Sequence, residues 1–184
     1  KINNPSGISR QTAIEEGLKA VDGKALINSI SGEEKKLKEI LPLAKKYGAA
    51  LLALALDDAG IPQTAEGRLK VAETILKRCL DAGIKKEDIL IDCLAMTVSA
   101  EPKSAVETLK AIRLIKERLG LSTVLGVSNI SFGLPCREAI NSSFLSMAIG
   151  AGLDAAIINP MNKAMMDAFF AARLLAAKDM NAER

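Results

Sequence analysis

The sequence predicts an α/β protein built on a parallel β-sheet, on two observations. Short apolar runs alternate with amphipathic helical stretches, and a glycine precedes every apolar run. The apolar runs span residues 25–27, 49–56, 89–91, 124–125 and 155–158. Runs that are apolar at nearly every position are typical of strands buried on both faces of a parallel sheet. We therefore expect five strands joined by crossover helices.

Glycines and polar residues mark the limits of each unit. A glycine in the left-handed conformation can close a helix. The candidate glycines are Gly23, Gly48, Gly83, Gly120 and Gly152. The polar residues that stop the runs are Asn28, Asp57, Asp92, Asn129 and Asn159, which are 29, 35, 37 and 30 residues apart. That spacing fits one strand, one loop and one crossover helix per unit.

The helical stretches carry start signals and apolar faces. Residues 31–34 (SGEE) have the form of a capping box, and Thr64 and Pro102 stand where first turns are expected to begin. Two apolar faces at helical spacing are predicted to pack in the core: Leu37, Ile40, Leu41 and Ala44, and Val106, Leu109, Ile112 and Ile115. Residues 164–177 are expected to form a helix whose wide apolar face packs on the sheet or contacts a second subunit.

Composition narrows the class of protein. The chain has 184 residues, of which 49% are hydrophobic and 26% charged, so we expect one compact domain over residues 1–184. The sequence has no long apolar run and no leader peptide, which predicts a cytoplasmic protein without a membrane span. The net charge of +3 is spread along the chain and 3% of residues are aromatic, which argues against nucleic-acid binding.

The absence of histidine excludes several kinds of catalytic site. Without His, the chain cannot form Ser-His-Asp or Cys-His pairs or most catalytic zinc sites. The 3 cysteines form no close pair and are expected to be reduced thiols in the core or in loops. Lys24 stands at the wrong end of its strand for a Schiff base. Asp57 and Asp58 are interpreted as a loop and a helix cap rather than as a metal site.

The polar residues that stop the strands form the candidate ligand site. Parallel strands joined by right-handed crossovers place their carboxyl ends on one side of the sheet, where α/β proteins bind ligands. One such residue alone is more often a turn former or helix cap, but five together favour a ligand site. Asn28 and Asp92 stand inside apolar sequence, so we expect them to be buried. An amide and a carboxylate held together can match the donors and acceptors of a planar heterocycle.

Four segments of the sequence resemble one family. They are ALINSISGE at 25–33, ILID at 89–92, TVLGVSNISFGLP at 123–135 and AGLDAAIINP at 151–160. In this order they resemble the pterin-binding methyltransferases, above all the methyltetrahydrofolate:corrinoid methyltransferases and the folate module of cobalamin-dependent methionine synthase. Dihydropteroate synthase is a more distant relative. The stretch at 126–135 is the most specific part of the resemblance.

The resemblance implies a TIM (β/α)8 barrel of pterin-binding type, in which the five strands are the fourth to the eighth. Such barrels typically have about 250 residues. A chain of 184 residues is therefore expected to hold an incomplete barrel that lacks its amino-terminal strands. The third strand of the family ends in an Asp that binds the pterin, and the nearest counterpart here is Asn3. Asn3 is thus a further candidate for substrate binding.

The resemblance also implies roles for individual residues. Asn28 and Asp92 would hydrogen-bond the pterin ring, and Gly126 and Ser128 would line its pocket. Asn129 would approach the nitrogen that carries the methyl group. That nitrogen is a poor leaving group unless proton density reaches it as the bond breaks. Asn129 and Asp92, with ordered water, are therefore the expected catalytic groups.

The implied reaction is methyl transfer between a methyltetrahydrofolate-type pterin and the cobalt of a corrinoid protein. Since the chain has no histidine for a corrinoid-binding motif, the cobalamin is expected on a partner that docks at the carboxyl end of the barrel. A homodimer is also expected. One alternative is a non-catalytic pterin-binding or assembly fragment. Another is a dihydropteroate synthase relative, which is disfavoured because the late loops offer only Arg137 and Lys163 as basic residues.

Overall fold

The computed structural model describes residues 10–179. Five strands form one parallel sheet in the order β1-β2-β3-β4-β5, so neighbours in the sheet are also neighbours along the chain. The strands are β1 (Leu26–Ser31), β2 (Ala50–Leu54), β3 (Ile89–Asp92), β4 (Ser122–Gly126) and β5 (Ala155–Ile157). The prediction of an α/β fold with a parallel sheet is confirmed.

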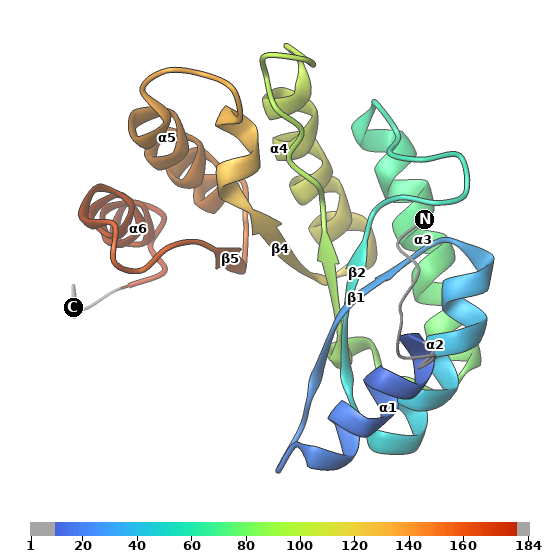
Figure 1. The fold of residues 1–184 in the computed structure, drawn as a ribbon. Coiled ribbons are helices and arrows are strands. Elements are labelled where there is room, and N and C mark those ends of the chain that lie inside the picture. Colours follow the sequence, from blue (N-terminus) through green and yellow to red (C-terminus); the bar gives the residue numbers. More distant parts are fainter. Residues whose placement is uncertain (1–9, 180–184) are drawn as a thin grey trace.

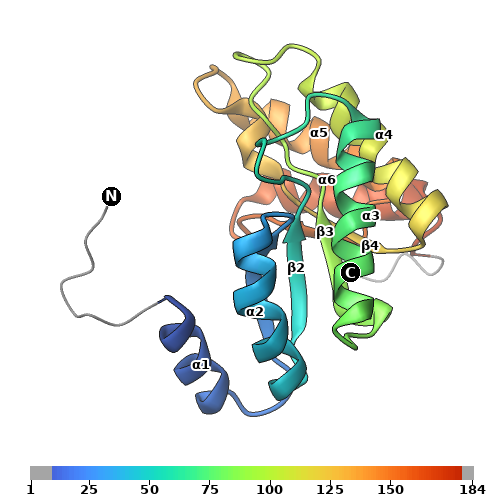
Figure 2. The same ribbon diagram turned by 90° about the vertical axis from the view of Figure 1, so that its right-hand side faces the viewer.

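Helices connect the strands and follow one another in an arc along one face of the sheet (Figure 1). They are α1 (Arg10–Ala20), α2 (Glu34–Tyr47), α3 (Ala65–Asp81), α4 (Ser104–Leu114), α5 (Arg137–Gly150) and α6 (Lys163–Leu175). Three short helical turns precede β3, extend α4 and follow β4: η1 (Lys86–Asp88), η2 (Ile115–Leu119) and η3 (Val127–Ser131). The first helix, α1, lies beside α2 (Figure 2). Glu15 on α1 accepts hydrogen bonds from Lys46 and Tyr47 on α2.

The glycine turns expected before each strand are confirmed. All five glycines have positive φ angles, between 56° and 108°. Other residues adopt this conformation only with strain, so glycine is the natural choice at such a turn. Gly48 and Gly120 directly close α2 and η2 in the left-handed conformation. The same local device therefore ends the helical part of every unit.

The helix starts are only partly as expected. Thr64 caps α3, because its hydroxyl accepts a hydrogen bond from an amide three residues on at 3.1 Å. The capping box predicted at residues 31–34 does not form, since Ser31 is the last residue of β1. Instead, the N–H of Glu34 donates to Oδ2 of Asp58 at 3.3 Å. The interpretation of Asp58 as a helix cap is thus confirmed.

The hydrophobic core lies between the sheet and the helices. One face of the strands supplies Ile27, Ile30, Leu51, Ala53, Ile89, Ile91 and Leu125. The predicted apolar face of α2 is buried against them. The last three members of the second predicted face are buried, Leu109 and Ile112 on α4 and Ile115 at the start of η2. Val106 is 52% exposed because the buried face of α4 runs through Thr108 and Ala111. Pro102 precedes α4 by two residues instead of standing in its first turn.

The opposite face of the sheet is called the inner face. The strand register places on it Leu26, Asn28, Ser31, Ala50, Leu52, Leu54, Leu90, Asp92, Ser122, Val124, Gly126, Ala155 and Ile157. At the two edges of the sheet, Leu26 is 50% and Ile157 is 51% exposed. Within residues 10–179 no further strand pairs with the outer edge of β1 or β5. The inner face is therefore largely apolar and open at both edges.

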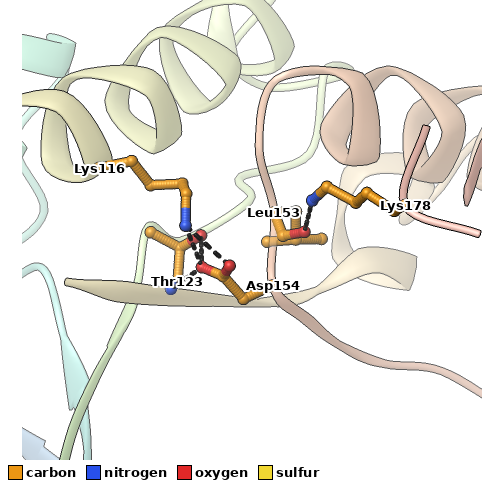
Figure 3. A network of polar contacts seen from close by, with 5 residues as sticks. All are labelled: Lys116, Thr123, Leu153, Asp154 and Lys178. Carbon is orange, nitrogen blue, oxygen red and sulfur yellow. Dashed lines mark hydrogen bonds and ion pairs between the residues drawn. The ribbon is translucent and has the colours of Figure 1, made fainter. Parts of the chain in front are cut away.

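A polar cluster joins the amino-terminal ends of β4 and β5 (Figure 3). Asp154 accepts hydrogen bonds from Nζ of Lys116 at 2.7 and 2.8 Å, and from the N–H and hydroxyl of Thr123 at 2.8 and 3.2 Å. Beside it, Nζ of Lys178 donates to the carbonyl of Leu153 at 2.8 Å. Burial acts to raise the pKa of Asp154, but Lys116 and Thr123 outweigh it and hold that pKa below its ordinary value.

The helix expected over residues 164–177 is present as α6, which packs against α5 (Figure 1). Met165 is buried, and the rings of Phe169 and Phe170 meet edge to face with centroids 5.3 Å apart. Leu175 at the end of the helix is exposed. Packing within the chain is thus confirmed, while contact with a second subunit stays a prediction.

Three other expectations can be checked in the described part of the chain. No helix between residues 10 and 179 is both long enough and apolar enough to cross a membrane. All three cysteines are unpaired, with Cys79 and Cys93 buried and Cys136 exposed at the start of α5. Lys24 precedes β1, at the amino-terminal end of the sheet, where it bonds Asp88.

Candidate functional site

Asp92 is buried at the carboxyl end of β3. It is 8% exposed, and its partners in the strand register are Leu54 of β2 and Val124 of β4. Burial among these apolar side chains raises the pKa of Asp92 to about 6. The N–H of Leu94, 2.8 Å from Oδ1, and the nearby charge of Arg68 act in the opposite direction. A carboxyl group that can change its charge near neutral pH is a feature common at functional sites.

Asn28 departs from its expected environment in two respects. It lies in the middle of β1 and not after it, because the strand continues past a bulge that follows Asn28. It is exposed rather than buried, since β1 is an edge strand within the described residues. The register aligns Asn28 with Leu90, two strands away and two residues before Asp92. Asn28 and Asp92 therefore share the inner face, with Cα atoms about 12 Å apart by strand geometry.

Gly126, Ser128 and Asn129 lie where β4 passes into the turn η3. A Cβ atom on Gly126 would be 3.3 Å from Nδ2 of Asn129, so the Asn129 amide lies against the inner-face side of Gly126. Ser128 and Asn129 are exposed. The Asn129 side chain makes no hydrogen bond to another residue between 10 and 179. Its amide is therefore available on the same face of the sheet as Asp92.

The loops around this face are bonded to one another. In the loop after β3, the hydroxyl of Thr97 donates to the carbonyl of Phe132 at 2.7 Å. At the start of α5, Nη2 of Arg137 donates to the carbonyl of Ser128 at 3.0 Å. These bonds fix the turn that carries Asn129 from two sides. No motif in the sequence announces them, because they join polar loop residues that are far apart along the chain.

The remaining strand-end residues are not part of this group. Oδ1 of Asp57 accepts the N–H of Ala59 at 2.9 Å, and Oδ1 of Asn159 accepts the N–H of Met161 at 3.0 Å. For these two residues the turn-forming role that is common for Asp and Asn applies. Asn3 lies outside the described residues.

Arg68, which no motif marks, lies buried beneath the carboxyl end of β3. It is 1% exposed and donates hydrogen bonds to two backbone carbonyls just after β3 and to the hydroxyl of Thr108. A signal for its burial exists in the sequence. Arg68 stands at helical spacing within the apolar face of α3, three residues after Ala65 and four before Ala72.

The groups assembled on the inner face suit hydrogen bonding to a ligand. Among residues 10–179, no cluster of three or more His, Cys, Asp or Glu side chains could hold a metal ion. The predicted site residues among the polar groups of this face are Asp92 with its carboxyl and Asn28 and Asn129 with their amides. Together, fold and site define an α/β protein of the β/α-barrel class whose candidate ligand site lies at the carboxyl ends of parallel strands.

Comparison with known sequences narrows this class to one family. Residues 9–159 match the family described as pterin binding enzyme, so the chain belongs to that family. It is 37% identical over 159 residues to a methionine synthase of Mycobacterium leprae, covering 79% of this chain and 13% of that protein. It is 33% identical over 157 residues to a methylcorrinoid:tetrahydrofolate methyltransferase of Eubacterium limosum, covering 84% of this chain and 58% of that protein. The chain thus spans less than two thirds of these relatives.

Solved structures show the same architecture. A dihydropteroate synthase of Yersinia pestis with a pterine-sulfa conjugate has a TM-score of 0.67 at 19% identity, covering 92% of this chain and 67% of that chain. A dihydropteroate synthase of Coxiella burnetii with pteroic acid has a TM-score of 0.64 at 16% identity, covering 94% and 66%. Identities this low establish the fold alone. The described residues therefore form a partial TIM barrel of five consecutive strand–helix units, in agreement with the predicted fold class.

Proposed function

We propose that this chain binds a methyltetrahydrofolate-type pterin at the carboxyl ends of its strands and takes part in methyl transfer with the cobalt of a corrinoid protein. The observation that carries the proposal is the buried carboxyl of Asp92, which shares the inner face with the amides of Asn28 and Asn129. Family membership supports the pterin, and the relatives named as methionine synthase and methylcorrinoid:tetrahydrofolate methyltransferase support the transfer.

Asp92 and Asn28 are the proposed recognition groups. Oδ1 of Asp92 accepts the N–H of Leu94, which leaves Oδ2 to accept a hydrogen bond from a ring N–H or an amino group. A hydrogen bond to a charged group is stronger than a neutral one, and a site with few water molecules strengthens it further. The Asn28 amide both donates and accepts, so it suits the other side of a flat heterocycle. Gly126 leaves room beside them for the ring.

Asn129 is the proposed catalytic group together with Asp92. In methyl transfer to cobalt, the carbon–nitrogen bond breaks, its electron pair stays on the pterin nitrogen, and the carbon forms a bond with the electron-rich metal. The nitrogen must gain a proton as this happens, so a hydrogen-bond donor near it stabilises the transition state more than the ground state. The Asn129 amide, which has no partner among residues 10–179, can donate this bond directly or through water.

A partner is proposed to bring the corrinoid. The chain contains no histidine to bind cobalt, so the corrinoid would arrive on another protein or domain. The large apolar side chains of Phe132 and Met161 are exposed in the loops at the carboxyl ends of the strands, and both suit such a contact. A homodimer is also proposed, through the exposed apolar residues Leu174 and Leu175 at the end of α6.

A second candidate function is pterin binding without catalysis. The observation that favours it is the absence of histidine, which leaves the chain without the side chain most often used as a catalytic acid or base. Dihydropteroate synthase activity is disfavoured, because Lys163 pairs with Asp167 and Arg137 is bonded within its own loop. A diphosphate leaving group needs a cluster of free basic side chains.

The test compares two strand-end asparagines, Asn129→Ala and Asn159→Ala. Pterin affinity is measured by calorimetry with methyltetrahydrofolate, and transfer is measured with free cob(I)alamin. We expect Asn129→Ala to bind within about threefold of the wild type and to lose at least about 100-fold in transfer rate. Asn159→Ala should match the wild type in both.

Three outcomes would contradict the whole proposal or a part of it. Absence of pterin binding by the wild-type chain would overturn it entirely. Binding without transfer by the wild type would favour the second candidate. Equal transfer rates for the wild type and Asn129→Ala would remove Asn129 from the mechanism.

A further inference from the structure

We infer that Arg68 is a positioning residue for the Asp92 carboxyl: it holds the two residues after β3 in the turn that aims this carboxyl at the inner face. The effect of this turn on pterin binding rests on the proposed function, whereas the geometry of the turn is independent of it. Arg68 lies on α3, on the other side of the sheet from the inner face, so it cannot itself touch a ligand bound there.

The guanidinium of Arg68 is buried without a carboxylate partner. Its Nε donates to the carbonyl of Pro62 at 3.0 Å, and its Nη1 lies 2.9 Å from the hydroxyl of Thr108. No carboxylate within residues 10–179 forms an ion pair with it. Burying an ion costs several kcal/mol, and an apolar side chain would fill the same space at lower cost. The hydrogen bonds of the Arg68 guanidinium must therefore explain why a charged residue is buried at this position.

Those bonds converge on one short turn. Nη1 of Arg68 donates to the carbonyl of Cys93 at 3.1 Å and to the carbonyl of Leu94 at 3.0 Å. The hydroxyl of Thr108 also donates to the Leu94 carbonyl, at 3.1 Å. Leu94 has a φ angle of 59°, in the left-handed region that leucine rarely adopts. Strained backbone of this kind persists only where its surroundings determine it.

The strained turn acts directly on Asp92. The carbonyl of Cys93 and the N–H of Leu94 belong to one planar peptide unit and point in opposite directions. The bond from Arg68 to that carbonyl therefore directs the N–H to Oδ1 of Asp92, 2.8 Å away. The hydrogen bond from Leu94 occupies one carboxyl oxygen, fixes the rotation of the carboxyl group and leaves the second oxygen free. Without the bonds from Arg68, the peptide unit between Cys93 and Leu94 would be free to rotate and the Leu94 N–H would leave the carboxyl. Arg68 thus determines the direction of Asp92 through the backbone between them.

Charge gives the arrangement a measurable signature. Arg68 favours the ionised form of Asp92, against the burial that disfavours it. The other titratable groups near the pair are Cys93, whose pKa burial raises far above neutrality, and Glu107 on α4. The pKa of Glu107 is lowered by the N–H of Ala65 and by Lys110. Neither group changes charge between pH 5 and pH 8, so a change in that range reports on Asp92 itself.

The experiment titrates Asp92 in the full chain by carbon-13 NMR of its carboxyl group. The variants are Arg68→Met, which keeps an unbranched side chain and removes the charge, and Arg68→Lys, which keeps the charge but lacks the planar fork that bonds Pro62 through Nε and the turn after β3 through Nη1. In Arg68→Met the Asp92 pKa should rise by about 1, and the Leu94 amide signal should move. In Arg68→Lys the pKa should return toward the wild-type value while the Leu94 signal stays displaced.

A matched control and a second variant keep the result decisive. Arg78→Met removes an exposed arginine from the same helix, where it pairs with Glu34, and should leave both signals unchanged. If Arg68→Met does not fold, Thr108→Val removes one anchor of the turn and should raise the Asp92 pKa by a smaller amount. An unchanged Asp92 pKa and an unmoved Leu94 amide in a folded variant would overturn the inference and leave Arg68 as a packing residue.

Pterin binding supplies a separate readout. Methyltetrahydrofolate affinity should fall by about tenfold in both Arg68→Met and Arg68→Lys, because both lose the direction of the carboxyl. The midpoint of its pH dependence should move only in Arg68→Met. Failure of the wild type to bind the pterin would count against the proposed function alone, since the NMR titration needs no ligand. Equal affinity in the wild type and both variants would count against positioning.

Discussion

Lys116 and Asp154 form an ion pair at the end of the sheet opposite to Asp92, with Nζ 2.7 and 2.8 Å from the two carboxylate oxygens (Figure 3). Lys116 comes from the last turn after α4, and Asp154 stands just before β5. The same carboxylate also accepts two hydrogen bonds from Thr123 of β4. The pair therefore joins two neighbouring units, at the end of a barrel whose residues serve stability rather than chemistry.

Replacing Asp154 by Asn should lower the free energy of unfolding by about 1 kcal/mol at pH 7. The expected loss is small because about a third of each side chain, Lys116 and Asp154, is exposed to water, which weakens the attraction between their charges. The pKa of Asp154 is lower in the folded chain than in the unfolded chain, so its contribution is present above the unfolded value of about 3.9 and is lost as the pH falls through the folded value. Urea unfolding at pH 7 measures the loss of stability in the Asn variant, and unfolding at pH 3 measures how far that difference shrinks as Asp154 is protonated.

The control for this prediction is Asp167→Asn on α6. Asp167 pairs with Lys163 at 2.5 Å, but this pair is far more exposed and lies within one helix. Its loss should change stability by less than about 0.5 kcal/mol. Equal effects of the two substitutions would show that the connection between β4 and β5 contributes nothing beyond a surface pair.

Replacing Asp92 by Asn should change how stability depends on pH. Burial raises the folded pKa of Asp92 to about 6, so the folded chain binds this proton more tightly than the unfolded chain. The resulting stabilisation is complete below the unfolded pKa of about 3.9 and is lost as the pH rises through about 6, a loss of up to about 3 kcal/mol. The Asn variant should lack this decline.

The measurement for Asp92 is chemical unfolding of both proteins at several values between pH 5 and pH 8. At pH 8 the Asn variant should be at least as stable as the wild type, yet its affinity for methyltetrahydrofolate should be at least about tenfold weaker. Parallel stability curves for the two proteins would contradict the assignment of Asp92 as the shifted carboxyl.

Replacing Gly126 by Ala tests the position of the Asn129 amide. Gly126 has a φ angle of −76°, which alanine adopts without strain, so the effect of the substitution is purely steric. The new methyl group would lie 3.3 Å from Nδ2 of Asn129 and would push the amide away. Methyl transfer should fall at least about tenfold, with a change in stability of less than about 1 kcal/mol. Single-turnover transfer and thermal unfolding measure the two effects.

Gly150→Ala is the matched control for Gly126. Gly150 ends α5, and a Cβ there meets nothing within 4 Å. Alanine should raise stability by up to about 1 kcal/mol, because it loses less backbone freedom than glycine in a helix, and transfer should not change. A Gly126→Ala variant with wild-type transfer would show that the Asn129 amide does not act where it lies.

Charges placed on the sheet edges should reduce association of this 184-residue chain. Leu26 on β1 and Ile157 on β5 are half exposed, beside strand edges that pair with no further strand within residues 10–179. Such edges invite pairing with other chains. Leu26→Lys and Ile157→Lys should each weaken self-association at least about tenfold in sedimentation experiments. Val106→Lys, equally exposed on the outer face of α4, should have no such effect.

Much of the fold follows from local sequence patterns. The five strands and the glycines before them could be predicted because apolar runs and left-handed turns depend on residues close together in the chain. The start of α2 could not be predicted in this way. Its first N–H, that of Glu34, donates a hydrogen bond to Asp58, which is distant in the sequence, and Ser31 remains in β1. Val106 was placed on the wrong face because packing, not spacing alone, selected the buried stripe of α4.

The candidate site could be predicted in part for similar reasons. Asp92 ends its strand and is buried, as its apolar surroundings in the sequence indicate. Asn28 was expected to be buried at a strand end, but a bulge lengthens β1 and an open edge exposes it. The burial of Arg68 does not follow from its spacing alone. The residue stands on the apolar face of α3, but arginine is almost never fully buried. Its role depends on three acceptors contributed by distant segments.

A strand order that repeats the chain order has a consequence for how the molecule assembles. Leu26 pairs with Ala50 and Val124 with Ala155, so each pairing closes a loop of only one crossover. Loops of this size carry a smaller entropic cost than pairings between distant units would. The molecule can therefore nucleate on any two adjoining units and grow outward, and two pieces cut between units, such as after Gly120, should find each other and reassemble.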